Sequence, residues 1–271
     1  MILDTIFNRL WNDYITQNPS AGKIHSLFLK EGESVVNDHI AFRTLDFNEI
    51  NIDVLAQPFI SNGYVAKGEY VFKDKHLFAK HFESEKNTSA PRIFISQLVL
   101  SECSQFIQKT LKEAYEKANP AMYSPEELIF SGSLFNPLLY EVYSRLREES
   151  EYAAWFYVFG FRANHFTVSI NSLKKYNSLL SVNNLLKKNG FVLNSSGGEI
   201  KGNMADLLQQ SSTIADTVKV NFLEGSFEVP CCYYEFAQRY TDSTGQLYNG
   251  FIAKSADKIF ESTNFYSKNK A

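Results

Sequence analysis

The stretch DHIAFRTL (residues 38–45) decides the fold, because NHFTVSI (residues 164–170) repeats its arrangement of polar and apolar side chains. Successive side chains of a strand point to opposite faces. In the first stretch His39 and Arg43 therefore share a face across a small alanine, while larger hydrophobic side chains occupy the other face. His165 begins the same pattern in the second stretch. Both stretches are predicted to be strands whose polar faces line a common cup.

The elements that follow each of these strands also repeat. Helices are expected over residues 48–61 and 172–189, and each stops at an Asn-Gly pair. Strands rich in β-branched and aromatic residues are expected after each helix, over residues 64–72, 76–83 and 92–99 in the first half and 191–202, 216–225 and 226–240 in the second. The repeat indicates two like modules, because neither half can bury its concave face alone.

The predicted fold class is α+β, with duplicated βαβββ-type modules that form a curled mixed sheet around a central metal cup. We expect one compact domain over residues 1–271. Within it, the first module covers residues 35–98, a helical connector is inserted over residues 99–157, and the second module covers residues 158–262 with the C-terminal segment. An amphipathic helix is expected at the N-terminus, since its apolar residues recur at helical spacing.

Composition limits the classes of function. The 271 residues are 44% hydrophobic and carry a net charge of −3, which is too near neutral to direct the protein to nucleic acid or to an anionic membrane. The three cysteines form no disulfide or zinc pattern, and no apolar stretch reaches the length of a membrane span. We expect a soluble, cytoplasmic protein that recognises a small molecule at a local site, and the oligomeric state stays open.

A third strand supplies a carboxylate to the two histidines. In YYEFAQR (residues 233–239), Glu235 shares its face with Tyr233 and Arg239. Two His and one carboxylate on one side of a metal form the facial arrangement of non-haem iron(II) oxygenases, with open positions for substrate and dioxygen. Zinc, nickel or manganese on the same residues would instead favour hydrolysis, isomerisation or lyase chemistry. A metal-free module that binds a small carboxylate is the third alternative.

Other polar residues are weaker candidates. Arg43, four positions after His39, can bind a substrate carboxylate with two hydrogen bonds, or can simply pair with a neighbouring acid. Polar residues of GGEIKG (197–202) and QSST (210–213) can complete a pocket, although such stretches are more often turns and caps. His76 and His81 are five residues apart, a spacing that does not favour a shared metal, and the Cys231–Cys232 pair is expected to pack in a strand. No serine-hydrolase, zincin, dinucleotide or Walker motif is present.

Five segments in the same order resemble the 2-oxoadipate dioxygenase/decarboxylase family, also called 2-hydroxyglutarate synthase. They are VNDHIAFRTL, WFYVFGFRANHFTVSIN, GGEIKGN with QSSTIADTV, VPCCYYEFAQRY and GFIAKSADKIFEST, and they run from about residue 35 to residue 262. The resemblance implies a vicinal-oxygen-chelate-like fold and an iron(II) site without an organic cofactor. The family's two histidines and glutamate fall on His39, His165 and Glu235.

The same resemblance implies a reaction and a substrate site. A 2-oxo acid and dioxygen would give carbon dioxide and a hydroxylated product, so that 2-oxoadipate becomes 2-hydroxyglutarate in lysine breakdown. Arg43 would hold a substrate carboxylate, and Ser255 would lie near the far end of the substrate. The chain is shorter than members with that activity between Glu235 and Ser255, so the resemblance defines the metal ligands more firmly than the substrate.

Overall fold

The computed structural model describes residues 1–253, 258–259 and 261–263. Contacts within the chain divide it into two compact units. The first unit consists of Met1–Tyr14, Ala41–Asn164 and Val218–Val229, and the second of Ile15–Ile40, His165–Thr217 and Pro230–Ala271. Several elements cross the division, among them the helix α1 (Leu3–Gln17) and the strand β1 (Asn37–Leu45).

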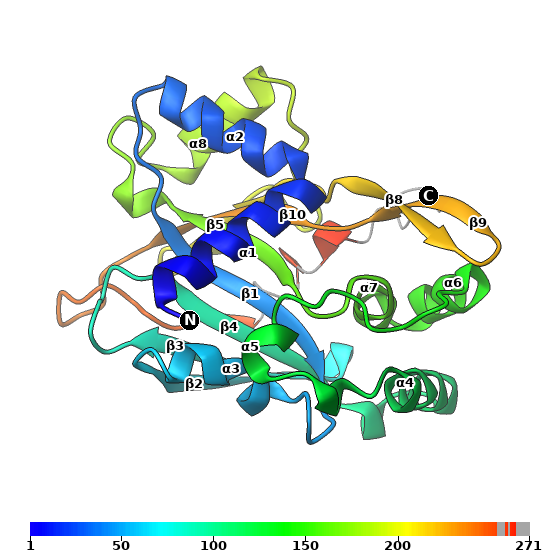
Figure 1. The fold of residues 1–271 in the computed structure, drawn as a ribbon. Helices are drawn as coiled ribbons and strands as arrows, with labels where there is room; N and C mark the ends of the chain where they lie inside the picture. The colour runs from blue at the N-terminus through cyan, green and yellow to red at the C-terminus, as the bar shows by residue number, and fades with distance from the viewer. Residues whose placement is uncertain (254–257, 260, 264–271) are drawn as a thin grey trace. The chain divides into compact units, whose positions relative to one another are not determined.

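The first unit contains one βαβββ series (Figure 1). Residues 41–45 of β1 are followed by α3 (Ile52–Ile60), β2 (Tyr64–Phe72), β3 (Leu77–Ser84) and β4 (Arg92–Leu98). The strand order is β2-β3-β4-β1, and β3 pairs antiparallel with both β2 and β4. On one face of the sheet, Phe42 of β1 packs against Phe59 of α3, with ring centroids 5.6 Å apart. Alternation along β1 leaves Arg43 on the opposite face.

Helices and a hairpin complete the first unit. The helices are α4 (Gln105–Ala118), α5 (Pro125–Leu128), α6 (Tyr140–Glu149) and α7 (Glu151–Phe159), and the hairpin strands are β8 (Thr217–Phe222) and β9 (Gly225–Pro230). Side chains cap the starts of three of these helices. Ser104 accepts a hydrogen bond from Ile107 N, Ser124 accepts one from Glu127 N, and Ser150 accepts one from Ala153 N. Residues 152–159 of α7 are all buried, so this helix forms much of the core.

The second unit contains the other series, after helix α2 (Pro19–Lys30) (Figure 1). It consists of β5 (Ala163–Ser169), α8 (Leu179–Lys188), β6 (Lys201–Asn203), β7 (Leu208–Ser212) and β10 (Tyr233–Arg239). The strand order is β5-β10-β7-β6. β10 pairs parallel with β5 and antiparallel with β7, so the sheet is mixed. The predicted α+β fold class with a repeated βαβββ order is confirmed.

The strands of the second unit have one apolar face and one face that carries the polar residues. Helices α2 and α8 both contact β10. The ring of Phe28 in α2 lies edge-on to Phe236, with centroids 6.3 Å apart. Since Glu235 precedes Phe236 in the strand, its carboxylate points to the face opposite α2. Packing against α2 therefore fixes the direction in which this polar side chain points.

Three predicted elements differ most from the observed ones, and the helix expected over residues 48–61 also begins later, at Ile52. The helix expected over residues 172–189 begins only at Leu179, because the buried carboxylate of Glu33 accepts hydrogen bonds from the backbone N–H groups of residues 174–176 and holds them outside a helix. The strand expected over residues 191–202 is reduced to Lys201–Asn203. Asn194 there accepts a hydrogen bond from Ser196 N, and such local bonds turn the chain.

The third difference is the break in the strand expected over residues 226–240, which divides into β9 and β10 at Cys231 and Cys232. Backbone hydrogen bonds from Cys231 N to Asp216 O and from Asp216 N to Cys232 O hold this break. Pro230 immediately before it cannot donate to a strand ladder. QSST (210–213), which was expected more often to form turns and caps, lies largely in β7.

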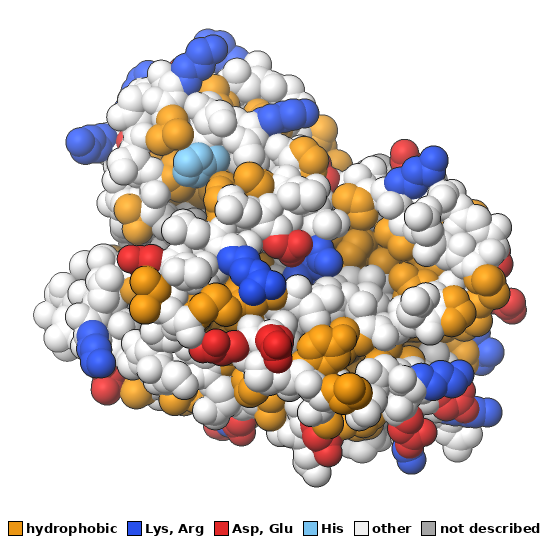
Figure 2. Space-filling model, viewed as in Figure 1, with side chains coloured by type: hydrophobic (Ala, Val, Ile, Leu, Met, Phe, Trp, Pro, Cys, Tyr) orange, Lys and Arg blue, Asp and Glu red, His pale blue; other side chains and the backbone are white. Residues whose placement is uncertain are grey.

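Short 3-10 turns occur at Lys73–Lys75, Leu100–Glu102, Pro120–Met122, Ile170–Ser172 and Glu261–Thr263. Within the described residues, no helix is both long enough and apolar enough to cross a membrane. Both basic and acidic side chains are present on the face seen in Figure 2.

Candidate metal centre

The second unit brings His39, His165 and Glu235 together from β1, β5 and β10. One nitrogen of each imidazole and one carboxylate oxygen all lie within 4.8 Å of one another. Oε1 of Glu235 is 3.6 Å from Nε2 of His39, and Oε2 is 3.3 Å from Nε2 of His165. All three side chains are buried. The parallel register places Tyr233 beside His165, so that Glu235 follows two residues later on the same face.

A carboxylate fixes the orientation of His39. Oδ1 of Asp38 is 2.8 Å from Nδ1 of His39, and Arg239 donates two hydrogen bonds to the same carboxylate. Burial alone would raise the pKa of Asp38, but Arg239 and His39 hold it well below its usual value. An ionised Asp38 keeps the proton of the neutral ring on Nδ1 and leaves the lone pair on Nε2, to which the Thr167 hydroxyl donates at 3.0 Å.

Glu235 is oriented by one hydrogen bond. Nε2 of Gln210 donates to its Oε1 at 2.6 Å, whereas Oε2 accepts no hydrogen bond within the described part of the chain. Burial raises the pKa of Glu235 to about 8, although the hydrogen bond from Gln210 acts in the opposite direction. A buried carboxylate is stabilised by a cation or by full hydrogen bonding. A divalent metal between the Nε2 atoms of His39 and His165 and this carboxylate would provide such a cation, so the residues fit a metal.

Two aromatic rings hold the imidazoles from the side. Tyr233 stacks on His165 with centroids 4.6 Å apart and planes 25° apart. Phe251 meets His39 edge-on, with centroids 4.9 Å apart. Both contacts restrict rotation of the imidazoles. Together with the hydrogen bond that Asp38 accepts from His39 and the one that Gln210 donates to Glu235, they make the ligand set rigid.

Comparison with known proteins identifies the family. The family model described as 2-oxoadipate dioxygenase/decarboxylase matches residues 6–128 and 133–246. The chloroplastic 2-oxoadipate dioxygenase/decarboxylase of Arabidopsis thaliana is 32% identical, over 96% of this chain and 76% of its own length. The chain belongs to this family of enzymes. The resemblance found in the sequence is thereby confirmed.

Solved structures agree with this assignment. The structure of hydroxyglutarate synthase from Oryza sativa, in complex with 2-oxoadipate, superposes on this chain with a TM-score of 0.90. The two sequences are 32% identical, and the match covers 98% of this chain and 93% of the rice chain. A Shewanella frigidimarina protein with only a provisional hydrolase description is 47% identical with a TM-score of 0.85, covering 92% of this chain and 97% of its own. A Ralstonia eutropha protein assigned to the glyoxalase superfamily has a TM-score of 0.69 and covers 89% of this chain and 83% of its own. Its sequence is only 17% identical, so this match supports the fold and nothing about function.

The predicted substrate residues of this family member are less defined than the ligands. Arg43 lies in the first unit, where its Nη1 donates to Oε1 of Glu151 at 3.0 Å. Its guanidinium lies over the rings of Tyr152 and Trp155, 4.8 and 4.9 Å from their centroids. The neighbouring acid considered from the sequence is therefore present, and the role of Arg43 toward a substrate stays a prediction. Ser255 lies outside the described residues.

The other polar candidates have structural partners. Lys201 is buried and its Nζ donates to the carbonyl of Asn194 at 2.5 Å, while Glu199 pairs with Lys187 at 2.9 Å. Ser211 donates to Asn183 at 2.8 Å. The remaining hydroxyls are also engaged: Ser212 bonds to Ser262, and Thr213 accepts from Tyr234 N.

The two rival clusters do not form sites. His76 is exposed, whereas His81 is buried between the hydroxyl of Tyr70 and the carboxylate of Glu83. Cys231 and Cys232 are buried and form no disulfide, as expected for packing residues, but they lie in the break between β9 and β10 rather than in a strand.

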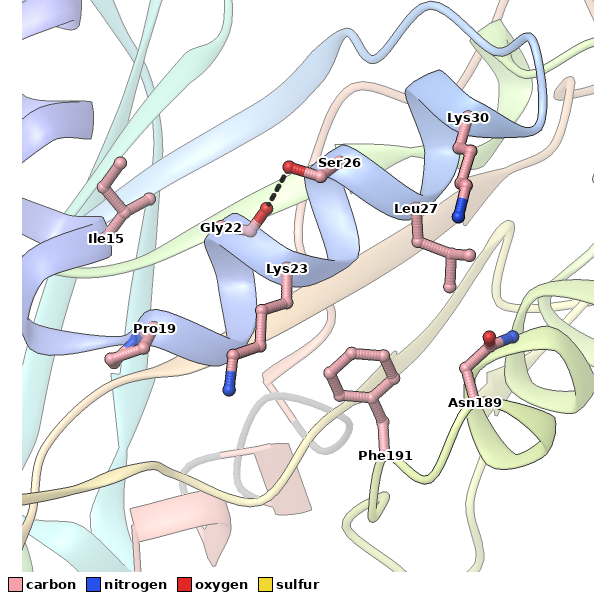
Figure 3. A pocket seen from close by; sticks show the side chains of 9 residues that line it. All are labelled: Ile15, Pro19, Gly22, Lys23, Ser26, Leu27, Lys30, Asn189 and Phe191. Carbon is pink, nitrogen blue, oxygen red and sulfur yellow. Dashed lines mark hydrogen bonds between the residues drawn. The ribbon is translucent and has the colours of Figure 1, made fainter.

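A pocket on the second unit has a different character from the metal centre. It has a volume of about 630 Å³ and lies along α2, facing Asn189 and Phe191 (Figure 3). Its charged lining residues are Lys23 and Lys30, and no carboxylate or imidazole lines it within the described residues. This pocket therefore provides none of the ligand types found at the metal centre.

Proposed function

We propose that this protein is an iron(II)-dependent dioxygenase that decarboxylates and hydroxylates a dicarboxylic 2-oxo acid. For 2-oxoadipate, one molecule of dioxygen would yield 2-hydroxyglutarate and carbon dioxide. The observation that supports the proposal most strongly is the buried His39, His165 and Glu235 set, in which one carboxylate oxygen accepts no hydrogen bond from the described residues. Membership of the family and the 2-oxoadipate bound by the rice relative support the choice of substrate.

The residues of this chain would hold and orient the reactants. His39, His165 and Glu235 would hold the metal, and iron(II) bound there would supply the capacity to activate dioxygen. Asp38 keeps the Nδ1 proton of His39 in place, and Gln210 holds Oε1 of Glu235. One nitrogen of each imidazole and one carboxylate oxygen lie within 4.8 Å of one another, close enough to share one ion.

The substrate's carboxylates would be held by other groups. Arg43 would bind one of them, since a guanidinium offers two parallel donors to a carboxylate. Tyr152 and Trp155 support the guanidinium from its face, and Nη1 donates a hydrogen bond to Glu151. Ser255 would contact the far end of the substrate. A role in lysine breakdown and a cytoplasmic location belong to the same proposal.

A metal-dependent hydrolase, isomerase or lyase is the second candidate function. The same three ligands suit zinc, and the Shewanella relative has a provisional hydrolase description. The two candidates differ in their need for dioxygen, because only the oxidative reaction consumes it.

The experiment is anaerobic reconstitution with iron(II), followed by addition of 2-oxoadipate in an oxygen electrode and mass spectrometry of the product. We expect oxygen uptake with formation of 2-hydroxyglutarate, both lost in Glu235→Ala. Glu199→Ala is the matched control, because Glu199 pairs with Lys187 and is not one of the ligands. Turnover that proceeds equally without oxygen would favour the second candidate, and no turnover despite bound iron would reject 2-oxoadipate as the substrate.

A further inference from the structure

Arg239 is a buried cation whose three nitrogens all act as donors. Nε donates to Oδ2 of Asp38 at 2.7 Å, and Nη2 donates to Oδ1 at 2.8 Å, so the pair is bidentate. Nη1 donates to the backbone carbonyls of Tyr248 and Gly250, at 3.1 and 2.7 Å. The guanidinium therefore joins a side chain next to a proposed ligand to a segment that follows β10 in sequence.

The same segment reaches His39 by a second route. Phe251 is buried and meets the His39 ring edge-on at 4.9 Å, while Cζ of Arg239 lies 5.2 Å from the centroid of Phe251. Asp38 connects the two routes, because it accepts a hydrogen bond from Nδ1 of His39. His39, Asp38, Arg239 and Phe251 thus form a closed ring of contacts within the second unit.

We propose that Arg239 is a positioning residue that couples residues 248–251 to the metal ligand His39. The inference rests on the metal site of the proposed function. A displacement of residues 248–251 would move the guanidinium and, through Asp38, the direction of the His39 lone pair. Conversely, a metal held by His39 would fix its imidazole and so would restrain residues 248–251.

The geometry requires arginine at this position. A planar guanidinium can bind a carboxylate with two nitrogens and still donate from the third, whereas an ammonium lacks this fixed fork. Lysine at position 239 would keep the charge beside Asp38 but lose the simultaneous contacts to the carbonyls of Tyr248 and Gly250. Arg239→Lys therefore separates the coupling from the simple presence of a cation.

The test measures cobalt(II) binding and proteolysis in the full-length protein. We expect Arg239→Lys to weaken cobalt binding about 10-fold to 100-fold, as is usual when the partner of a ligating histidine is disturbed, and to change the visible cobalt spectrum. In the wild type, cobalt should slow chymotrypsin cleavage after Tyr248 and Phe251, mapped by mass spectrometry. In Arg239→Lys this protection by cobalt should be lost.

Two further variants keep the test decisive. Arg162→Lys alters another Arg–Asp pair, with Asp13 in the first unit, and should leave both readouts unchanged. If Arg239→Lys does not fold, Phe251→Leu removes the ring contact to His39 without breaking the ion pair and should weaken cobalt binding and the protection.

A purely structural role would lower the melting temperature of Arg239→Lys while leaving cobalt affinity and protection as in the wild type, and that result would overturn the inference. A wild type that binds no cobalt would overturn the metal site as well. Cobalt binding with coupled protection but no oxidation of 2-oxoadipate would leave the inference standing and reject only the proposed reaction.

Discussion

Gln210 is the residue on which the charge state of Glu235 depends most directly. Burial raises the pKa of Glu235 to about 8, and the hydrogen bond from Gln210 counteracts this rise. Metal binding must displace the proton, so affinity should increase with pH up to about 8 and then level off. Gln210→Ala should move this plateau to higher pH and weaken binding at pH 7 by about tenfold.

Titration with cobalt(II) at a series of pH values measures this prediction. Gln209→Ala is the matched control, because Gln209 is the adjacent residue of β7 and accepts a hydrogen bond from Tyr240 instead. A pH profile of Gln210→Ala that coincides with the wild type would show that the hydrogen bond does not influence the carboxylate.

Arg43 allows a second prediction about a single residue. If it binds a substrate carboxylate, Arg43→Lys should reduce kcat/KM for 2-oxoadipate by about 10-fold to 100-fold, mainly through KM, since charge-assisted hydrogen bonds contribute roughly 1.5–3 kcal/mol. Cobalt affinity should not change. Glu151→Gln removes the ion-pair partner and leaves the guanidinium, so it serves as the comparison. Equal losses of thermal stability in both variants with an unaltered KM would assign Arg43 a structural role only.

At the scale of elements, Glu33 determines where α8 can begin. Its carboxylate is buried, yet three backbone hydrogen bonds from residues 174–176 lower its pKa below the usual value. Glu33→Gln should reduce the free energy of unfolding at pH 7 by about 1–3 kcal/mol, because buried donors lose a charged acceptor. A lowered folded-state pKa contributes stability above the unfolded value, and this contribution disappears as the pH falls through the folded value.

The difference between wild type and Glu33→Gln should therefore shrink in acid, as measured by urea unfolding at pH 7 and at about pH 4. Glu31→Gln is the control, since Glu31 is more exposed and bonds to the side chains of Lys175 and Tyr176. A difference that stays constant with pH would mean that the charge of Glu33 is unimportant for the start of α8.

The sequence predicted elements best where the pattern is local. The alternation of polar and apolar side chains in residues 38–45 and 164–170 predicted both ligand-bearing strands, and each predicted end lies within one residue of the observed end. The Asn-Gly pairs gave the ends of α3 and α8 within one residue. The start of α8 was wrong because it depends on Glu33, which is more than 140 positions away from residues 174–176. Such long-range hydrogen bonds leave no periodic signal.

The candidate site follows the same rule. The face on which each side chain lies in its predicted strand was enough to select His39, His165 and Glu235, and the structure brings these three residues together. Gln210 was among the polar stretches considered, but its bond to Glu235 depends on the register between β7 and β10. Asp38 was not selected, because period two assigns it to the face opposite His39, whereas its carboxylate bends around the strand to reach Nδ1. Their roles as metal ligands and supports stay predictions.

At the scale of the whole molecule, all three proposed ligands belong to the second unit. A ligand that binds only the folded state stabilises it by about 2.7 kcal/mol at 100 times its dissociation constant. For a chain of this size, that corresponds to a rise in melting temperature of about 5–10 °C. His165→Ala should abolish the rise, whereas His76→Ala, which alters an exposed histidine, should retain it.

Hydrogen exchange with and without cobalt(II) locates this stabilisation within the chain. Amides of β5 and β10 should gain protection, because the metal would link the side chains of adjacent strands. The β2-β3-β4 meander belongs to the first unit and supplies none of the three ligands. Metal should therefore slow the hydrogen exchange of its amides much less. Equal protection of both units would mean that metal binding suppresses only global unfolding. Protection confined to the meander would contradict a site at His39, His165 and Glu235.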